Sequence, residues 1–104
     1  MLTKEEILAQ IIRTKPEIES MGINVLGLFG SYADGTSTEA SDIDILIETT
    51  PEFVHQSDPL HAFTLLQELK EKYQKIFQVS VDIADKNGLN DIGKEYILQS
   101  VIYV

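Results

Sequence analysis

Apolar residues near the N-terminus recur at intervals of three and four, which is the spacing of one helix face. Four residues share this spacing: Ile7, Leu8, Ile11 and Ile12. Thr3 and Glu6 form a capping-box pattern, in which the two side chains satisfy backbone amides at a helix start. We therefore predict a first helix over Lys4–Thr14. Pro16 should interrupt it and open a short second helical piece that runs through Met21.

Three aliphatic runs predict strands. Val25–Phe29 has no polar residue, as in a strand that is buried on both faces. Ile43–Glu48 is the second strand, and Thr49, Thr50 and Pro51 should close it before a polar loop that reaches Pro59. Gln78–Ala84 is a third strand of strict alternation. One face of this strand carries Val79, Val81 and Ile83. The other face carries Ser80, Asp82 and Ala84.

Two further helices are predicted from amphipathic spacing. The stripe Leu60, Phe63 and Leu66 favours a helix over Pro59–Lys75, whose apolar side either covers the sheet or meets a partner helix. A last helix should begin at Asp91, after the Asn87-Gly88 turn, and run to near the C-terminus, although residues 101–104 would equally suit a terminal strand. Candidates for the buried side of this helix are Ile92, Tyr96, Ile97 and Val101. The resulting order of helices and strands predicts an α/β fold with a small sheet.

Length and charge narrow the possible functions. The chain has 104 residues, of which 43% are hydrophobic, so we expect one domain over residues 1–104. The formal net charge is -9, and Arg13 is the single arginine beside seven lysines, so a basic surface for direct nucleic-acid binding is not expected. The aliphatic runs are too short for a membrane span, and the charged start does not resemble a signal peptide. We therefore expect a cytoplasmic protein without membrane contact.

Two aspartates at the start of the second strand are the first candidates for chemistry. Because side chains alternate along a strand, Asp42 and Asp44 share one face, and Ile43 and its aliphatic successors take the other. Asp82 lies on the polar face of its own strand, and would come within about 5 Å of the pair if the two strands were neighbours. Three such carboxylates suit Mg²⁺, which binds a few carboxylates together with substrate phosphates.

A Gly-Ser pair follows the first strand. Gly30 would let the backbone approach a phosphate, and the Ser31 hydroxyl and nearby amides would bind its oxygens. The Gly-Lys-Ser/Thr of a Walker A loop is absent. An Asp-x-Asp pair and a third aspartate follow on later strands, which indicates in-line nucleotidyl transfer with two metal ions.

Residues 26–48, LGLFGSYADGTSTEASDIDILIE, resemble the signature of the minimal nucleotidyltransferase (MNT) family within the DNA polymerase beta superfamily. The shared pattern is G-S-x-A-x-G, a spacer, and S-D-x-D before aliphatic residues. The resemblance implies a small mixed sheet flanked by helices, with ATP as substrate. It also implies that Asp42, Asp44 and Asp82 bind two Mg²⁺ ions, that Asp82 helps to deprotonate the acceptor, and that Gly30 and Ser31 contact the triphosphate.

The family resemblance also implies a partner. Its members are commonly antitoxins encoded beside an all-helical HEPN toxin, so we expect transfer of AMP to a tyrosine hydroxyl of such a toxin. One departure favours an alternative: Asp34 stands where the family usually has arginine, and it adds negative charge beside the expected triphosphate. The alternative is a binding module that neutralises its toxin by complex formation. Aminoglycoside nucleotidyl transfer is a third possibility, and a homo-oligomer is compatible with each.

Other polar and aromatic residues leave more than one interpretation open. Tyr32 either stacks on a base or packs in the core. His55 and His61 match no common zinc spacing, and we assign them no role. Lys86 and Lys94 would either reach a triphosphate or remain in solvent.

Overall fold

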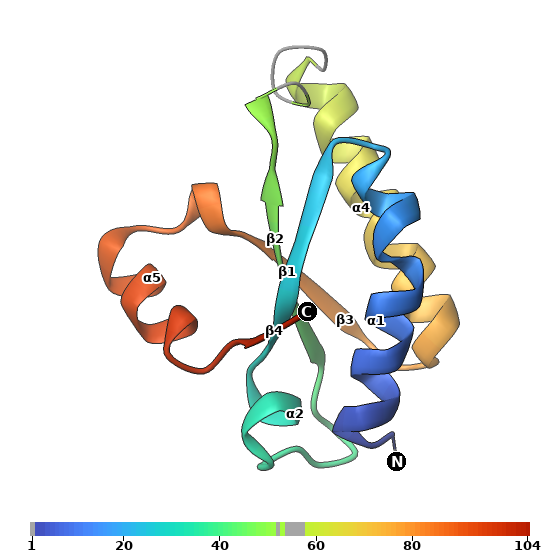
Figure 1. Ribbon diagram of the computed structural model, residues 1–104, viewed down its shortest axis with the longest axis vertical. Helices are drawn as coiled ribbons and strands as arrows, with labels where there is room; N and C mark the ends of the chain where they lie inside the picture. The colour runs from blue at the N-terminus through green and yellow to red at the C-terminus, as the bar shows by residue number, and fades with distance from the viewer. Residues whose placement is uncertain (1, 52, 54–57) are drawn as a thin grey trace.

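A four-stranded sheet lies at the centre of the protein, with two long helices on one side of it (Figure 1). The computed structural model describes residues 2–51, 53 and 58–104; His55 and most of the predicted polar loop lie outside these residues. The elements are α1 (Lys4–Glu19), β1 (Ile23–Phe29), α2 (Ser31–Asp34), β2 (Ile43–Thr49), α4 (Pro59–Phe77), β3 (Val81–Asp85), the 3₁₀ turn η1 (Lys86–Gly88), α5 (Asp91–Leu98) and β4 (Ile102–Tyr103).

The sheet has the strand order β3-β2-β1-β4 and is mixed. β1 pairs antiparallel with β2 on one side and with β4 on the other. β2 and β3 are parallel, because α4 carries the chain back between them. The predicted α/β fold with a small mixed sheet flanked by helices is confirmed.

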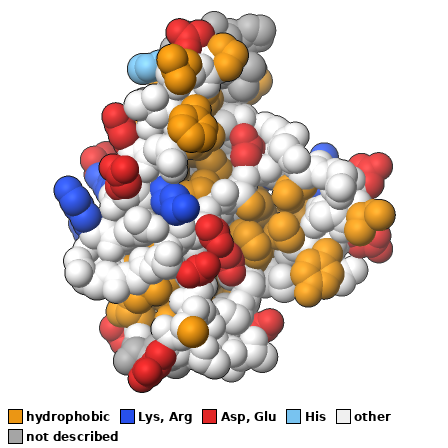
Figure 2. Space-filling view, turned by 180° about the vertical axis from the view of Figure 1, so that it is seen from behind, with side chains coloured by type: hydrophobic (Ala, Val, Ile, Leu, Met, Phe, Trp, Pro, Cys, Tyr) orange, Lys and Arg blue, Asp and Glu red, His pale blue; other side chains and the backbone are white. Residues whose placement is uncertain are grey.

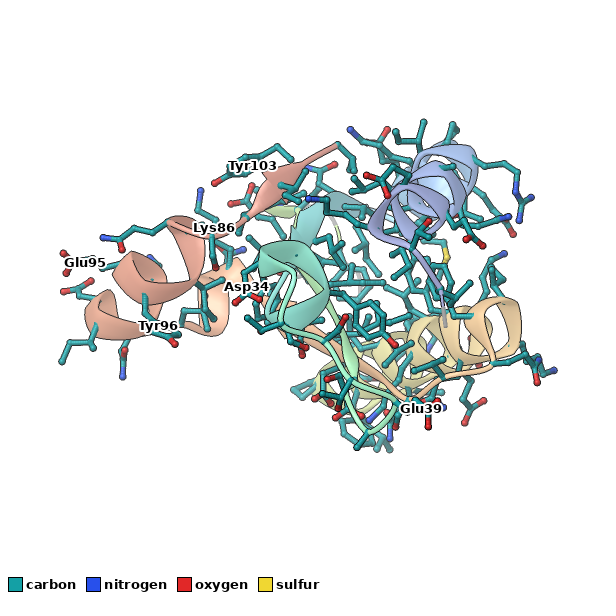
Figure 3. All side chains as sticks on the ribbon, turned by 90° about the horizontal axis from the view of Figure 1, so that it is seen from below. Asp34, Glu39, Lys86, Glu95, Tyr96 and Tyr103 are labelled. Carbon is teal, nitrogen blue, oxygen red and sulfur yellow. The ribbon has the colours of Figure 1, made fainter. Side chains whose placement is uncertain are left out.

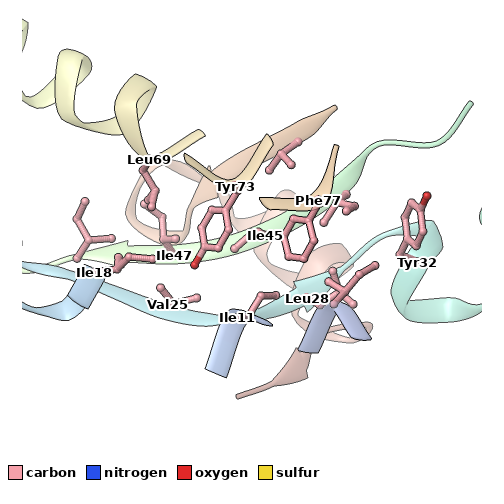
Figure 4. Packing of buried hydrophobic residues seen from close by; sticks show 14 of the residues in the cluster. Ile11, Ile18, Val25, Leu28, Tyr32, Ile45, Ile47, Leu69, Tyr73 and Phe77 are labelled. Carbon is pink, nitrogen blue, oxygen red and sulfur yellow. The ribbon is translucent and has the colours of Figure 1, made fainter. Parts of the chain in front are cut away.

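The hydrophobic core fills the space between the sheet and the helices α1 and α4 (Figure 4). Ile43, Ile45 and Ile47 of β2 are fully buried, as their alternation predicted. Tyr73 and Phe77 of α4 stack with ring centroids 5.9 Å apart. Each of these large side chains stabilises the fold by about 1.5–3 kcal/mol through burial. These buried residues fix β2 firmly. On its other face, Asp44 and Glu48 stay half-buried on either side of buried Leu46.

The first helix is longer than predicted. The Thr3–Glu6 capping box is present, but α1 continues through Pro16 to Glu19. Pro16 is exposed, so the hydrogen bond that it forfeits lies on the solvent side of the helix. Buried Ile18 keeps the last turn packed against the core. The predicted break at Pro16 is therefore wrong, because burial on the other face of the helix outweighs the proline.

The third strand begins later than predicted. α4 extends to Phe77, and Gln78 then caps it in the left-handed conformation, with φ 58°. A residue in that conformation cannot open a strand, so β3 starts at Val81 instead of Gln78. The alternation that was predicted for the later part of this strand is retained: Val81 is fully buried, and Asp82 is exposed.

The C-terminal segment contains both of the alternatives that the sequence left open, a helix and then a strand. α5 ends at Leu98, and Ile102 of β4 pairs with Leu28 of β1. Figure 1 shows α5 on the opposite side of the sheet from α1 and α4. The predicted burial of Ile92 and Tyr96 is wrong, since both are 80% exposed and α5 has no buried residue. Within the described residues, no second helix covers α5 on this side of the sheet, so these side chains face solvent.

The N-terminal part of α4 exposes large apolar side chains. Leu60 and Phe63 are 75% and 62% exposed, and Leu66 packs partly against the core. Figure 2 shows hydrophobic side chains exposed above and beside acidic ones on the face that is turned away in Figure 1. Within the described residues, no helix combines the length and the apolar character that crossing a membrane requires.

Candidate active site

Asp44 and Asp82 occupy matching positions on neighbouring parallel strands. Asp44 of β2 is the register partner of Asp82 of β3, just as Ile43 is the partner of Val81. Since Ile43 and Val81 point into the core, the two aspartates project together from the opposite face. The condition that the sequence analysis set for bringing Asp82 near Asp44, that the two strands be neighbours, is therefore met. Asp42 precedes the strand and is exposed.

The electrostatic environment of Asp44 is unfavourable to its charge. Partial burial, followed by repulsion from Asp82 and then from Asp42, raises the pKa of the Asp44 carboxyl to about 6. Both neighbouring acids therefore act on Asp44 at the start of β2. A cation placed beside these carboxylates would remove that repulsion.

Gly30 lies directly against Asp44. Its backbone has φ 77° and ψ -159°, a conformation that essentially only glycine adopts. A Cβ atom at this position would collide with Oδ2 of Asp44. The carbonyl of Gly30 accepts hydrogen bonds from the amides of Ala33 and Asp34, which closes the single turn of α2. The sequence therefore needs glycine here to bring the turn and the carboxylate together.

Asp34 has a partner inside its own turn. Its Oδ1 accepts hydrogen bonds from the backbone amide of Thr36, at 2.9 Å, and from the Thr36 hydroxyl. These two bonds lower the pKa of the Asp34 carboxyl below its ordinary value. The side chain thus stays ionised and stabilises the turn that follows α2.

A cleft of about 630 Å³ lies between this turn and α5. Its lining comprises Phe29, Gly30, Asp34, Asp44, Tyr96, Ile97, Gln99 and Ser100. In Figure 3, Asp34 on α2 and Tyr96 on α5 lie on the two sides of this cleft. The volume falls within the range of small-molecule sites. The sequence did not reveal the α5 side of the cleft, because the helical spacing of Tyr96 also suits a buried face.

The structure shows where the remaining polar and aromatic candidate residues lie. Tyr32 is only 4% exposed and belongs to the core, so the packing interpretation holds and stacking on a base does not. Lys86 forms an ion pair with Glu48 at 3.9 Å. The backbone amide of His61 donates to Asp58, which caps α4, and the structure adds no role for its imidazole.

Lys70 of α4 is a site residue that the sequence analysis missed. Its Nζ lies 4.0 Å from Oδ1 of Asp82, across the outer edge of β3. The signal was not visible in the sequence, because Lys70 follows the apolar stripe of its helix and precedes Asp82 by twelve positions. The structure therefore gives Asp82 a positive neighbour that Asp44 does not share.

The acidic side chains of this site offer oxygen ligands of the kind that Mg²⁺ binds. In the part of the chain that the structure describes, no three His, Cys, Asp or Glu side chains are grouped closely enough to hold a metal ion by themselves. The paired carboxylates of Asp44 and Asp82, with Asp42 beside them, still match the oxygen-only chemistry that Mg²⁺ prefers. Mg²⁺ usually completes its coordination with water and substrate phosphates, so these residues fit a nucleotide-bound ion better than a closed protein cage.

Solved structures share this fold. A solved structure of a protein provisionally described as a minimal nucleotidyltransferase aligns with a TM-score of 0.76 at 24% identity, over 99% of this chain and 97% of that one. A toxin–antitoxin complex crystallised with AMP-PNP aligns with a TM-score of 0.54 at 24% identity, over 88% of this chain and 63% of that one.

Sequence comparisons identify the family. Protein adenylyltransferase MntA of Thermococcus cleftensis is 31% identical over 105 residues, which cover 100% of this chain and 98% of that protein. MJ1379 of Methanocaldococcus jannaschii, provisionally named a protein adenylyltransferase, is 36% identical over the full length of both chains. The family model described as "Nucleotidyltransferase domain" matches residues 7–104. The resemblance seen in the Gly-Ser and Asp-x-Asp motifs is thus confirmed, and the chain belongs to the nucleotidyltransferase domain family.

Proposed function

We propose that this protein is an antitoxin that transfers AMP from ATP to a tyrosine hydroxyl of a HEPN-type toxin in the cytoplasm. The observation that carries the proposal is the pairing of Asp82 with Asp44, which lies against the Gly30 turn and lines the cleft. Full-length similarity to a protein named protein adenylyltransferase supports AMP transfer. The likeness to a toxin–antitoxin complex that contains AMP-PNP supports the partner and the nucleotide.

In this proposal, residues 1–104 form one minimal nucleotidyltransferase domain. Gly30 and Ser31 contact the triphosphate, because the turn opens with backbone amides and has no side chain at its first position. Asp42, Asp44 and Asp82 would hold Mg²⁺, with two ions expected. When bound there, Mg²⁺ would supply a Lewis acid that polarises the phosphate oxygens and offsets their charge.

Asp82 is the residue best placed to accept the proton of the acceptor. Its side chain is 60% exposed at the outer edge of the sheet, so an incoming hydroxyl can reach it. The hydroxyl gives its proton to Asp82, and its oxygen forms a bond to the α-phosphorus of ATP. The bond between that phosphorus and the β-phosphate bridging oxygen breaks, and pyrophosphate leaves on the opposite side. Asp44, on the inner strand, stays ionised throughout.

The surface chemistry supports a macromolecular acceptor. The net charge of -9 favours association with a basic partner, and it opposes direct binding to nucleic acid. Leu60 and Phe63 expose apolar area of the kind that protein interfaces bury. No membrane contact is part of the proposal, and a homo-oligomer remains compatible with it.

A second candidate function rests on Asp34. This carboxylate is ionised, lines the cleft, and faces the region where phosphate charge would accumulate. Its negative charge would repel the phosphates and weaken nucleotide binding. Under this alternative the protein neutralises its toxin by complex formation, without transfer.

One experiment separates the two functions. The purified protein is incubated with labelled ATP, Mg²⁺ and the toxin encoded beside its gene, and label on the toxin is measured. We expect transfer that falls at least a hundredfold in Asp44→Asn and Asp82→Asn, while the surface control Glu71→Gln retains it. Neutralisation of the toxin with no label in the wild-type protein would establish the binding module instead. Omission of Mg²⁺ tests the metal requirement in the same assay.

A further inference from the structure

The α5 side of the cleft has no role in the triphosphate chemistry. Gly30 and Ser31 follow β1, and the three aspartates lie at the starts of β2 and β3. Tyr96, Ile97 and Gln99 instead come from the C-terminal segment. A nucleotide is longer than its phosphates, so a second surface must accommodate the nucleoside. The α5 side is the part of this same cleft that remains.

Tyr96 is poorly placed for a structural role. The side chain is 80% exposed on a helix that has no buried residue, so it contributes little to the core. It nevertheless lines the cleft together with half-buried Ile97. An aromatic ring that is free of packing and forms part of a cleft wall offers a flat apolar surface to a ligand.

The two aromatic residues next to Gly30 and Ser31 in the sequence do not offer such a surface, and exposed Tyr103 does not line the cleft. Tyr32 is buried in the core and cannot receive a base. Phe29 also lines the cleft, but it is a half-buried residue of β1 beside Gly30, at the phosphate end. Tyr96 is therefore the exposed ring across the cleft from the phosphate turn (Figure 3).

We infer that Tyr96 is the platform on which the base of the bound nucleoside triphosphate stacks, with the side chain of Gln99 available to the base edge. The inference rests on the nucleotide-binding half of the proposed function. Stacking on an aromatic side chain accepts any base, because every base has a π-face. The preference for one base over another would then come from polar contacts such as those of the Gln99 amide.

Two ligands separate base recognition from phosphate recognition. AMP-PNP carries the base, and inorganic tripolyphosphate carries three phosphates without one. Dissociation constants for both, each with Mg²⁺, are measured by calorimetry on the wild-type protein, Tyr96→Ala, Tyr96→Phe and Phe63→Ala. Phe63 is a matched control, since it is an aromatic residue that is 62% exposed and lies outside this cleft.

We expect Tyr96→Ala to bind AMP-PNP about tenfold more weakly, as the loss of one stacked base implies. Tyr96→Phe keeps the ring and should stay within twofold of the wild-type protein, as should Phe63→Ala. Tripolyphosphate should bind equally to all four proteins. Thermal melts of the variants should coincide, because Tyr96 is exposed.

Unchanged AMP-PNP binding in Tyr96→Ala would overturn the inference, and so would an equal loss of tripolyphosphate binding. The proposed AMP transfer is tested by a different result, the label on the toxin. A wild-type protein that binds AMP-PNP through Tyr96 but transfers no AMP to the toxin would contradict the transferase and support the base platform. A wild-type protein that binds neither ligand would contradict both.

Discussion

Asp44 and Asp82 are register partners on adjacent parallel strands, and their carboxylates project from the same face of the sheet. Like charges that lie opposite each other destabilise a sheet. The buried side chains of Ile43, Ile45 and Val81 hold both strands in this register despite the repulsion. The fold therefore maintains an electrostatic strain that a cation would relieve.

Removal of the Asp44 charge should stabilise the folded protein. The folded pKa of about 6 lies above the ordinary 3.8, so the native state loses stability as pH rises from about 4 to 6, and the loss persists at higher pH. Asp44→Asn has no carboxylate to ionise, so the variant avoids this loss of stability. After allowance for solvent screening, we expect the variant to gain about 1–2 kcal/mol of unfolding free energy at pH 7.

Urea unfolding of the wild-type protein and Asp44→Asn, measured from pH 3.5 to 7.5, checks this prediction. The gain should shrink toward zero below pH 4, where the wild-type carboxyl is protonated in both states. An Asn variant that is less stable than the wild-type protein at pH 7 would show that Asp44 makes a favourable contact instead.

A methyl group at Gly30 should displace the Asp44 carboxylate. Gly30→Ala introduces a Cβ that collides with Oδ2 of Asp44, in a backbone conformation that already costs alanine about 1–3 kcal/mol. We expect AMP transfer to fall by at least a hundredfold. Gly35→Ala is the matched control, because Gly35 also has a positive φ of 85° but has open space around its Cβ position.

Activity and thermal melting of the two glycine variants are compared side by side. Both should melt at lower temperature than the wild-type protein, and only Gly30→Ala should lose transfer. Equal losses of transfer in both would mean that backbone strain, and not the contact with Asp44, is the cause.

Lys70 should compete with a metal ion for Asp82. Its ammonium lies 4.0 Å from the carboxylate, so Lys70→Met removes the positive charge that an incoming cation must displace. We expect half-maximal transfer at a lower Mg²⁺ concentration, by about threefold, with stability changed by less than about 0.5 kcal/mol. Lys72→Met is the control, since Lys72 pairs with Glu17 at 2.6 Å, away from the site.

The comparison requires a Mg²⁺ titration of the transfer rate in both lysine variants. A higher Mg²⁺ requirement in Lys70→Met than in Lys72→Met would reverse the assignment. Lys70 would then be a residue that orients Asp82 for metal binding.

Alanine at Gly27 should detach the C-terminal strand. A Cβ on Gly27 would collide with the carbonyl oxygen of Ile102, where β4 pairs with β1. We expect Gly27→Ala to weaken AMP-PNP binding about tenfold, because α5 loses its anchor, and to leave tripolyphosphate binding nearly unchanged. Amide hydrogen exchange should show faster exchange at Val104, whose amide donates to Leu26 at 3.0 Å. Retained protection there would contradict the prediction.

The sequence predicted best those features that depend on alternation along strands. Alternation placed Asp44 and Asp82 on the outer face of β2 and β3, and their proximity followed once the strands were neighbours. The metal-ligand roles of these residues, and of Asp42, are still predictions. The structure explains the glycine at position 30 by its contact with the Asp44 carboxylate, and the predicted contact with a phosphate is still a prediction.

The sequence predicted least well those features that depend on how the helices pack against the sheet and against each other. The spacing of Tyr96 on α5 is that of a buried face, but α5 is the outer layer on that side of the sheet, and no second helix of the described residues covers it. Pro16 was expected to end a helix that packing of Ile18 prolongs. Lys70 and Asp82 come close only because α4 packs beside β3, and the spacing of charges in the sequence does not predict this contact.

The chain leaves the sheet at one edge, β3, and rejoins it at the opposite edge, β4, so α5 bridges the side that carries the paired acids. This bridge is held at its two ends, and no residue of α5 is buried. Sequence drift in residues 89–100 is therefore free of the constraints that fix the strands. Descendants of such a protein can acquire a different nucleotide preference by remodelling this span, while the acid-bearing framework beneath it stays the same.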